Sequence, residues 1–170
     1  MGAEHDIEAL HRKFTAYHEA GTRLHLPVNY TFLAQCFGIL GRPDSGLDSI
    51  KAAISAIEST EQRNWEPETW RVKGDLVLQQ LDVNSVPSTQ RGQAEVEAEE
   101  CYRKAIEIAQ HQQSKLFELR AAMSLSRLLQ HSGRINEARV LLSEVYNRFT
   151  EGFDSVDLKQ ARVLLEALSL

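Results

Sequence analysis

The chain has 170 residues, of which 42% are hydrophobic and 25% charged, values typical of a folded domain or a stretch of repeats and not of a disordered protein. Nineteen Lys and Arg residues against 24 Asp and Glu residues give a formal charge of −5, so we expect no large basic surface for nucleic acid. No apolar run of about 18 residues and no secretory signal pattern occur, so we expect no membrane partner and a cytoplasmic location.

Apolar residues recur at helical spacing along nearly the whole chain, and no segment alternates with a period of two for long enough to predict a strand. The sequence therefore predicts an all-α protein of about eight helices, forming a single domain over residues 1–170. In chain order, the expected elements are a leading helix (5–22), three antiparallel hairpins (27–60, 66–112 and 116–149) and a helix that caps the array (157–168). A polar segment containing Pro87 predicts an exposed loop over 83–92.

Glycine, proline and small polar residues mark the expected helix ends. Gly41 and Gly133 follow periodic segments and suit the left-handed conformation that closes a helix. Pro27 suits the first turn of the helix that it begins. Asp154 or Ser155 can cap the last helix by accepting one of its free amide hydrogens.

The hairpins are related by an internal repeat of about 40 residues, with a 12-residue insertion before the third copy. In the first helix of each hairpin, a small residue aligns: Ala34, Gly74 and Ser126. In the second helix, a small residue is followed four positions later by a large one: Gly46/Ile50, Ala98/Tyr102 and Ala138/Leu142. Antiparallel helices approach closely only where small residues meet, so each large residue is expected to fill the notch of a facing helix. Because one hairpin cannot bury its own apolar face, the hairpins are expected to stack.

With these residues the chain resembles the tetratricopeptide repeat family over about residues 27–149. It departs from the usual period of about 34 residues and lacks the proline that commonly ends a repeat, which indicates a variant with longer helices. The resemblance implies a right-handed α–α superhelix, a solenoid, whose groove holds extended peptides or partner helices.

A narrower resemblance is to the C-terminal helical-repeat region of bacterial multidomain signalling ATPases, which carry adenylate/guanylate cyclase or transcription-regulator modules. The segments that carry it are 98–109, 118–122, 133–139 and the closing Phe149-Thr150-Glu151-Gly152-Phe153-Asp154. Neither an NTPase nor a cyclase domain is present in these residues. Helix 5–22 is similar to the second half of an earlier repeat, which suggests a fragment of a longer protein or a stand-alone relative.

The sequence has none of the motifs that would predict an enzyme: no phosphate-binding loop, no His-Glu-x-x-His and no Gly-x-Ser-x-Gly. His11, His18 and His25 are spaced by two helical turns, about 10 Å, which is too far for two ligands of one metal ion. Cys36 and Cys101 lie on apolar helix faces and are expected to be core residues. We therefore expect no catalysis, no cofactor and no metal site.

The concave face of stacked hairpins, lined by the first helix of each pair, is the expected binding surface. Nine residues lie one turn from the packing stripe and are expected to face it: Thr31, Gln35, Glu68, Arg71, Asp75, Arg120, Met123, Arg127 and Gln130. Among them Arg71, Arg120 and Arg127 form a hypothetical patch for carboxylates, because the guanidinium fork suits that group. The alternative is that these charges are paired with Asp75 or nearby glutamates.

These patterns predict a non-catalytic module for protein–protein interaction or regulation, which binds another protein or a peptide in its groove. The alternative is a sensor module that binds a small ligand in the same groove and relays the signal to a fused effector of a multidomain signalling protein. The apolar side of helix 5–22 also suggests a homodimer formed through this terminal helix.

Overall fold

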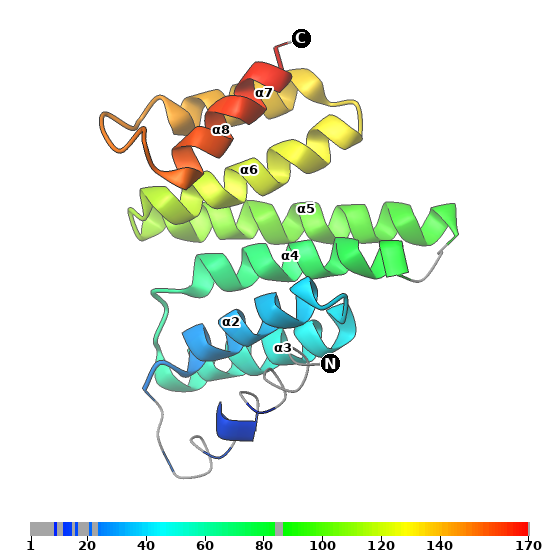
Figure 1. Cartoon of the computed structure of the whole chain (residues 1–170), viewed down its shortest axis with the longest axis vertical. Helices are drawn as coiled ribbons and strands as arrows, with labels where there is room; N and C mark the ends of the chain where they lie inside the picture. The colour runs from blue at the N-terminus through cyan, green and yellow to red at the C-terminus, as the bar shows by residue number, and fades with distance from the viewer. Residues whose placement is uncertain are drawn as a thin grey trace.

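Helices make up all the regular structure of the residues that the computed structural model describes, which are 24–83 and 87–169 together with 9, 12–14, 16 and 21. They are α2 (Leu26–Ile39), α3 (Pro43–Thr60), α4 (Glu66–Val83), α5 (Ser88–His111), α6 (Lys115–His131), α7 (Ile135–Tyr146) and α8 (Val156–Ala167). Figure 1 shows them following one another from α2 and α3 at one end to α7 and α8 at the other. The prediction of an all-α protein is confirmed.

The predicted leading helix, 5–22, falls almost entirely outside the described residues. The homodimer contact that we expect from it therefore stays a prediction. None of the helices among the described residues has the length and apolar character needed to cross a membrane.

The residues at several helix ends have the roles that the sequence predicts for them. Gly41 and Gly133 have φ values of 68° and 77°, in the left-handed region that costs a glycine little. Pro27 lies in the first turn of α2, where its missing N–H leaves no hydrogen bond unmade. Of the two candidate caps for α8, Ser155 performs the role, because its Oγ accepts a hydrogen bond from the backbone N–H of Leu158.

The predicted loop over 83–92 is wrong in its second half. Helix α4 ends at Val83 and α5 begins at Ser88, so residues 88–92, which were predicted as loop, belong to a helix. Pro87 is the N-cap of α5, an extended position with a φ of −59° that proline tolerates without breaking a helix. Residues 89–93 are all exposed, and an exposed turn of helix lacks the apolar periodicity by which helices are predicted.

Two kinds of helix contact build the molecule. Each helix packs against the next in sequence, and α2, α4, α6 and α8 also pack directly against one another in that order. In contrast, α3, α5 and α7 do not pack directly against one another within the described part of the chain. The even-numbered helices thus form one continuous row, whereas the odd-numbered helices stand apart (Figure 1).

Aligned small residues are in close contact in two of the hairpins. A Cβ atom on Gly46 would lie 3.2 Å from the carbonyl oxygen of Ala34. In the third hairpin, the hydroxyl of Ser126 donates a hydrogen bond to the carbonyl of Ala138 over 3.1 Å. These two contacts pair the positions that the repeat register aligns, and they confirm that small residues meet within the first and third hairpins. In the second hairpin, the atoms nearest to the position of a Cβ on Gly74 belong to the ring of Tyr102.

The core is divided between the two ends of the helix row. A large cluster of buried side chains joins α5, α6, α7 and α8, with Leu119, Leu125 and Leu142 fully buried in it. A smaller cluster joins α2, α3 and α4 around Ile50 and Leu76. Helix α4 lies between the two clusters, so its side chains are placed to link both parts of the core.

Candidate functional site

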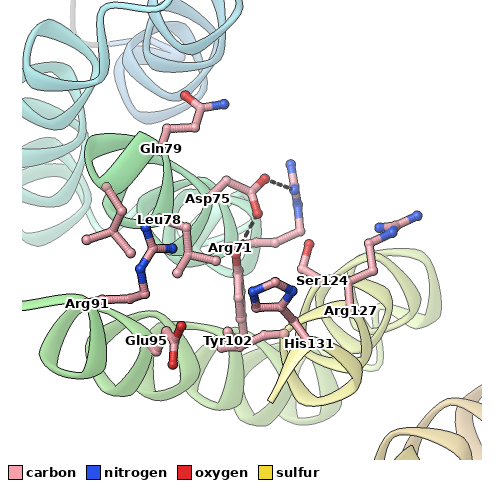
Figure 2. Close-up of a pocket in the computed structure, with 12 residues that line it drawn as sticks. Arg71, Asp75, Leu78, Gln79, Arg91, Glu95, Tyr102, Ser124, Arg127 and His131 are labelled. Carbon is pink, nitrogen blue, oxygen red and sulfur yellow. Dashed lines mark hydrogen bonds and ion pairs between the residues drawn. The ribbon is translucent and has the colours of Figure 1, made fainter. Parts of the chain in front are cut away.

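A hollow of about 470 Å³ opens between α4, α5 and α6. Leucines from α4 and α6 supply apolar lining: Leu78, Leu81 and Leu128. Charged or titratable side chains from all three helices line the rest: Arg71, Asp75, Arg91, Glu95, Arg127 and His131. Figure 2 shows Tyr102 and His131 in the middle of this site, with Arg91 and Arg127 on opposite sides. The hollow therefore combines an apolar lining with separated charges.

Three of the nine predicted contact residues line this hollow: Arg71, Asp75 and Arg127. Gln35 belongs to the same neighbourhood, because its Nε2 donates a hydrogen bond to Glu68, which in turn accepts from Arg71. The structure thus brings part of the predicted surface together on the row of even-numbered helices.

Three others of the nine are not available to a partner. Thr31, Glu68 and Met123 are 0%, 2% and 3% exposed, so the expectation that they face an open groove is wrong. The cause lies between the helices: α2 packs on α4 and α4 on α6, which covers positions one turn from the predicted packing stripe. The hydroxyl of Thr31, for example, lies 2.7 Å from that of Thr69 on the neighbouring helix.

The remaining two predicted residues, Arg120 and Gln130, lie towards opposite ends of α6. Arg120 makes a two-pronged bond to Asp157 at the start of α8, from Nε over 2.8 Å and from Nη2 over 3.0 Å. Gln130 is half-buried near the end of α6. Arg120 therefore joins the third hairpin to the closing helix.

A network of polar side chains ties α2, α4 and α5 together beside the hollow. The buried carboxylate of Glu68 accepts hydrogen bonds from Gln35 over 3.0 Å and from Arg71 Nε and Nη2 over 2.9 and 2.8 Å. Arg71 Nη1 donates to Asp75 Oδ2 over 2.5 Å. The other oxygen of Asp75 accepts from the hydroxyl of Tyr102 over 2.8 Å. Figure 2 shows the two bonds of Asp75 as dashed lines.

These contacts decide which of the three predicted arginines can meet a partner. Burial by itself lowers the pKa of Arg71, but the bonds to Glu68 and Asp75 outweigh it and raise that pKa above its usual range. Arg71 is paired with Asp75 and with Glu68, as the alternative stated above expects. Arg120 is also paired with a carboxylate of this chain, but its partner is Asp157, which that alternative did not name. Arg127 is exposed and makes no ion pair with any side chain that the structure describes.

The prediction missed two residues that complete the site, Arg91 and His131. Arg91 falls in the segment predicted as a loop, where helical spacing was not expected to apply. With α5 beginning at Ser88, Arg91 lies eleven residues and Glu95 seven residues before Tyr102, so all three share a helix face. His131 follows Arg127 by one turn and could have been found from the same spacing.

Tyr102 gives the site a pH dependence of stability. Burial, reinforced by the negative charge of Asp75 and the bond to it, raises the pKa of Tyr102 far above the ordinary value of about 10. Below about pH 10 the phenol is protonated in both the folded and unfolded states, and this stabilisation is fully present. Above about pH 10 the unfolded state loses the proton while the folded state keeps it, so we expect the free energy of unfolding to fall as the pH rises.

Urea unfolding between about pH 9 and 11 would measure this fall, because the midpoint should decrease steadily above the pKa of a free tyrosine. Tyr102→Phe should be less stable at neutral pH, since Asp75 loses a donor, and should show a flatter dependence on pH. Tyr30→Phe is the matched control, because its hydroxyl makes no hydrogen bond to a described residue. An equal slope in the Tyr102→Phe variant and the wild type would contradict the assignment.

The two cysteines show no sign of a reactive site. Both are free thiols; Cys101 is buried and Cys36 half-buried, and burial raises the pKa of each thiol. Among the described residues, no group of three His, Cys, Asp or Glu side chains could hold a metal ion.

No protein-family model matches the chain, and no curated protein matches it either. The resemblance to tetratricopeptide repeats therefore stays a prediction, which depends on the repeat register of the sequence.

Proposed function

We propose that the chain is a non-catalytic protein-interaction module of the tetratricopeptide type, with its binding surface on the even-numbered helices. The direct packing of α2, α4, α6 and α8, without such packing among α3, α5 and α7 in the described part of the chain, favours a stack that curves around the even-numbered row. The resemblance to tetratricopeptide repeats adds that this superhelix is right-handed. In such a stack the even-numbered row is the concave face.

The observation that carries this proposal is the hollow between α4, α5 and α6, at which exposed arginines remain unpaired beside leucine side chains. Arg91 and Arg127 make no ion pair with described side chains, although the other arginines next to this face, Arg71 and Arg120, are firmly paired. Unpaired charge around an apolar lining is typical of sites that recognise a partner. If these two arginines were only solvated surface charges, an apolar hollow beside them would not be expected.

The test is an affinity capture from lysate of the source cells, with the bound proteins identified by mass spectrometry. The variants are Arg127→Glu and, as a matched control, Arg139→Glu. Arg139 is exposed on α7 and, like Arg127, makes no ion pair with described side chains. We expect at least one protein to bind the wild type and Arg139→Glu and to be lost from Arg127→Glu, with unchanged thermal stability of all three.

A protein that binds all three forms equally would place the interaction on another face and contradict the proposed surface. If no protein is captured, while a small molecule raises the unfolding temperature of the wild type and not of Arg127→Glu, the sensor alternative is favoured. The volume of the hollow, about 470 Å³, falls within the range of small-ligand pockets, so this outcome has a structural basis.

A further inference from the structure

The apolar face of α8 is wider than its own chain covers. In the described part of the chain, α8 packs on α6 and α7 and on no other helix, and it lies at one end of the molecule (Figure 1). The residues of α8 that are buried in the core there are Leu158, Ala161, Leu164 and Leu168. Val156 and Val163 belong to the same helix but are 70% and 62% exposed.

These two valines belong to a regular stripe. Four exposed and uncharged residues of α8 follow one another at steps of 4, 3 and 4 positions, and we call them the outer stripe: Val156, Gln160, Val163 and Ala167. Residues at these steps lie along one side of a helix, and the same steps form the contact seam of two helices in a coiled coil. The outer stripe therefore has the spacing needed to pack against one further helix.

A second copy of the outer stripe complements the first when the two helices run in opposite directions. The stripe is centred between residues 161 and 162, so a two-fold axis at that point would place Val156 of one copy beside Ala167 of the other. The same axis would place Gln160 beside Val163. Every position of the stripe then has a partner, and no charge lies within the contact.

The charges next to the outer stripe favour this antiparallel arrangement. Lys159 and Glu166 are seven positions apart and flank the stripe on the same side. In the antiparallel pair, Lys159 of one copy would lie only two residues, about 3 Å along the axis, from Glu166 of the other. The two-fold axis makes this pair twice. In a parallel pair the two charges would stay about 10 Å apart along the axis and could not meet.

Both charges are available for such a contact. Lys159 makes no ion pair with any side chain that the structure describes. Glu166 approaches Arg162 of its own helix at 3.9 Å, and the side chains of this pair are 71% and 61% exposed. Because so exposed a pair contributes little to stability, Glu166 can turn to a lysine of another chain at little cost.

A membrane surface fits the same face less well. Helices that bind anionic membranes carry an excess of Lys and Arg and insert bulky apolar side chains. In α8, Lys159 and Arg162 are balanced by Asp157 and Glu166, and the outer stripe offers only valine and alanine as apolar residues. A different protein could occupy the stripe only with a matching pattern of apolar and charged residues, which a second copy has by symmetry.

We infer that two copies of this chain associate by antiparallel packing of their α8 helices, through the outer stripe and two Lys159–Glu166 pairs. The contact is separate from the hollow between α4, α5 and α6, so the inference goes beyond the proposed function and does not depend on it. Two helices of 12 residues form a small interface, so we expect a weak dimer with a Kd on the order of 100 µM.

The experiment is sedimentation velocity of the full chain at low ionic strength, over concentrations from about 10 µM to about 1 mM. Val156→Ser/Val163→Ser should weaken the association at least about ten-fold, because it removes apolar surface from the seam. The matched control is Phe32→Ser/Ile39→Ser on α2, which also replaces two exposed apolar residues, at 53% and 85% exposure. It should associate as the wild type does.

A charge exchange tests the antiparallel register. Lys159→Glu brings two glutamates together at each end of the contact and should weaken the dimer about ten-fold. Lys159→Glu/Glu166→Lys restores opposite charges and should recover the wild-type Kd to within about two-fold. A loss that came only from changed net charge or helix stability would not be recovered in this way. Because all these side chains are exposed, each variant should unfold close to the wild-type temperature.

A wild-type chain that stays monomeric over the whole concentration range would overturn the inference. So would a dimer that the α2 control weakens as much as Val156→Ser/Val163→Ser does, or one that the charge exchange does not recover. A dimer unaffected by every α8 variant would place the contact elsewhere, as with the homodimer expected from helix 5–22, and would also overturn it. Arg127→Glu should associate as the wild type does, so failure of the proposed binding surface and failure of this inference are distinguishable.

Discussion

Replacing Gly74 with alanine should lower the free energy of unfolding by about 2 kcal/mol, although alanine normally stabilises a helix relative to glycine by about 1 kcal/mol. A Cβ atom at this position of α4 would lie 2.6 Å from Cε1 and 2.9 Å from Cζ of Tyr102. The ring cannot move aside easily, because Tyr102 is 2% exposed and its hydroxyl is bound to Asp75. Overpacking of a buried ring therefore outweighs the gain in helix propensity.

Gly92→Ala is the matched control and should have the opposite sign. Gly92 lies in α5, and no atom lies within 4 Å of the place that an alanine Cβ would take. Alanine there adds helix propensity without a clash and should stabilise the chain by about 0.5–1 kcal/mol. Thermal or urea unfolding followed by far-ultraviolet circular dichroism measures both changes. The Gly74→Ala loss corresponds to a decrease in Tm of about 4–8 °C for a chain of this size.

A second variant separates the clash from other causes. In a Tyr102→Leu background, the smaller side chain leaves space for the new methyl group, so adding Gly74→Ala should no longer destabilise the protein. Strict additivity of the two substitutions would mean that the contact with the ring is not the reason for the glycine.

The contact between Gly74 and Tyr102 shows why parts of the fold could be predicted from the sequence. Both residues occupy repeat positions at which a small residue of one helix faces a large residue of another, and the spacing recurs in each hairpin. Such information is local and periodic. The first turns of α5 carry no such information, because residues exposed on all sides of a helix need no apolar period, and the helix was therefore predicted to begin too late.

The candidate site likewise has contacts that could be predicted from the sequence and contacts that could not. The pairs of Arg71 with Glu68 and Asp75 have the (i, i+3) and (i, i+4) spacing of helix neighbours, so their pairing could be anticipated from sequence. The pair of Arg120 with Asp157 joins residues 37 positions apart on different helices, and its existence depends on how α8 packs on α6. Contacts between residues far apart in the sequence decide which arginines remain unpaired. The helical period of the sequence does not predict such contacts.

Glu68→Ala should destabilise the chain more than any of the other single substitutions proposed above, by about 3 kcal/mol. The carboxylate is 2% exposed and accepts hydrogen bonds from Gln35 and from two nitrogens of Arg71. Its removal leaves Arg71, whose side chain is only 15% exposed, with Asp75 as its remaining acidic partner among the described residues. A buried charge that loses its partner costs far more than a surface pair contributes.

Asp48→Ala is the matched control, because it removes the carboxylate of an (i, i+3) pair with Lys51 whose side chains are 74% and 78% exposed. That change should alter the free energy of unfolding by less than about 0.5 kcal/mol. Urea unfolding of both variants measures the difference, which should be several-fold. Equal effects would mean that Glu68 is not held as a buried charge.

The Glu68→Met/Arg71→Met double variant tests the physical cause. If the loss in Glu68→Ala comes from the uncompensated charge of Arg71, then removing both charges and filling the space with apolar atoms should recover most of the stability. If the loss comes instead from the polar bridge between α2 and α4, the double variant should be no more stable than Glu68→Ala, because Gln35 has still lost its acceptor. Because Arg127 does not belong to this network, capture of a partner that depends on Arg127 should survive in the folded double variant. Stability and recognition would then be separable on the same face: paired charges hold α2, α4 and α5 together, and unpaired ones remain for the partner.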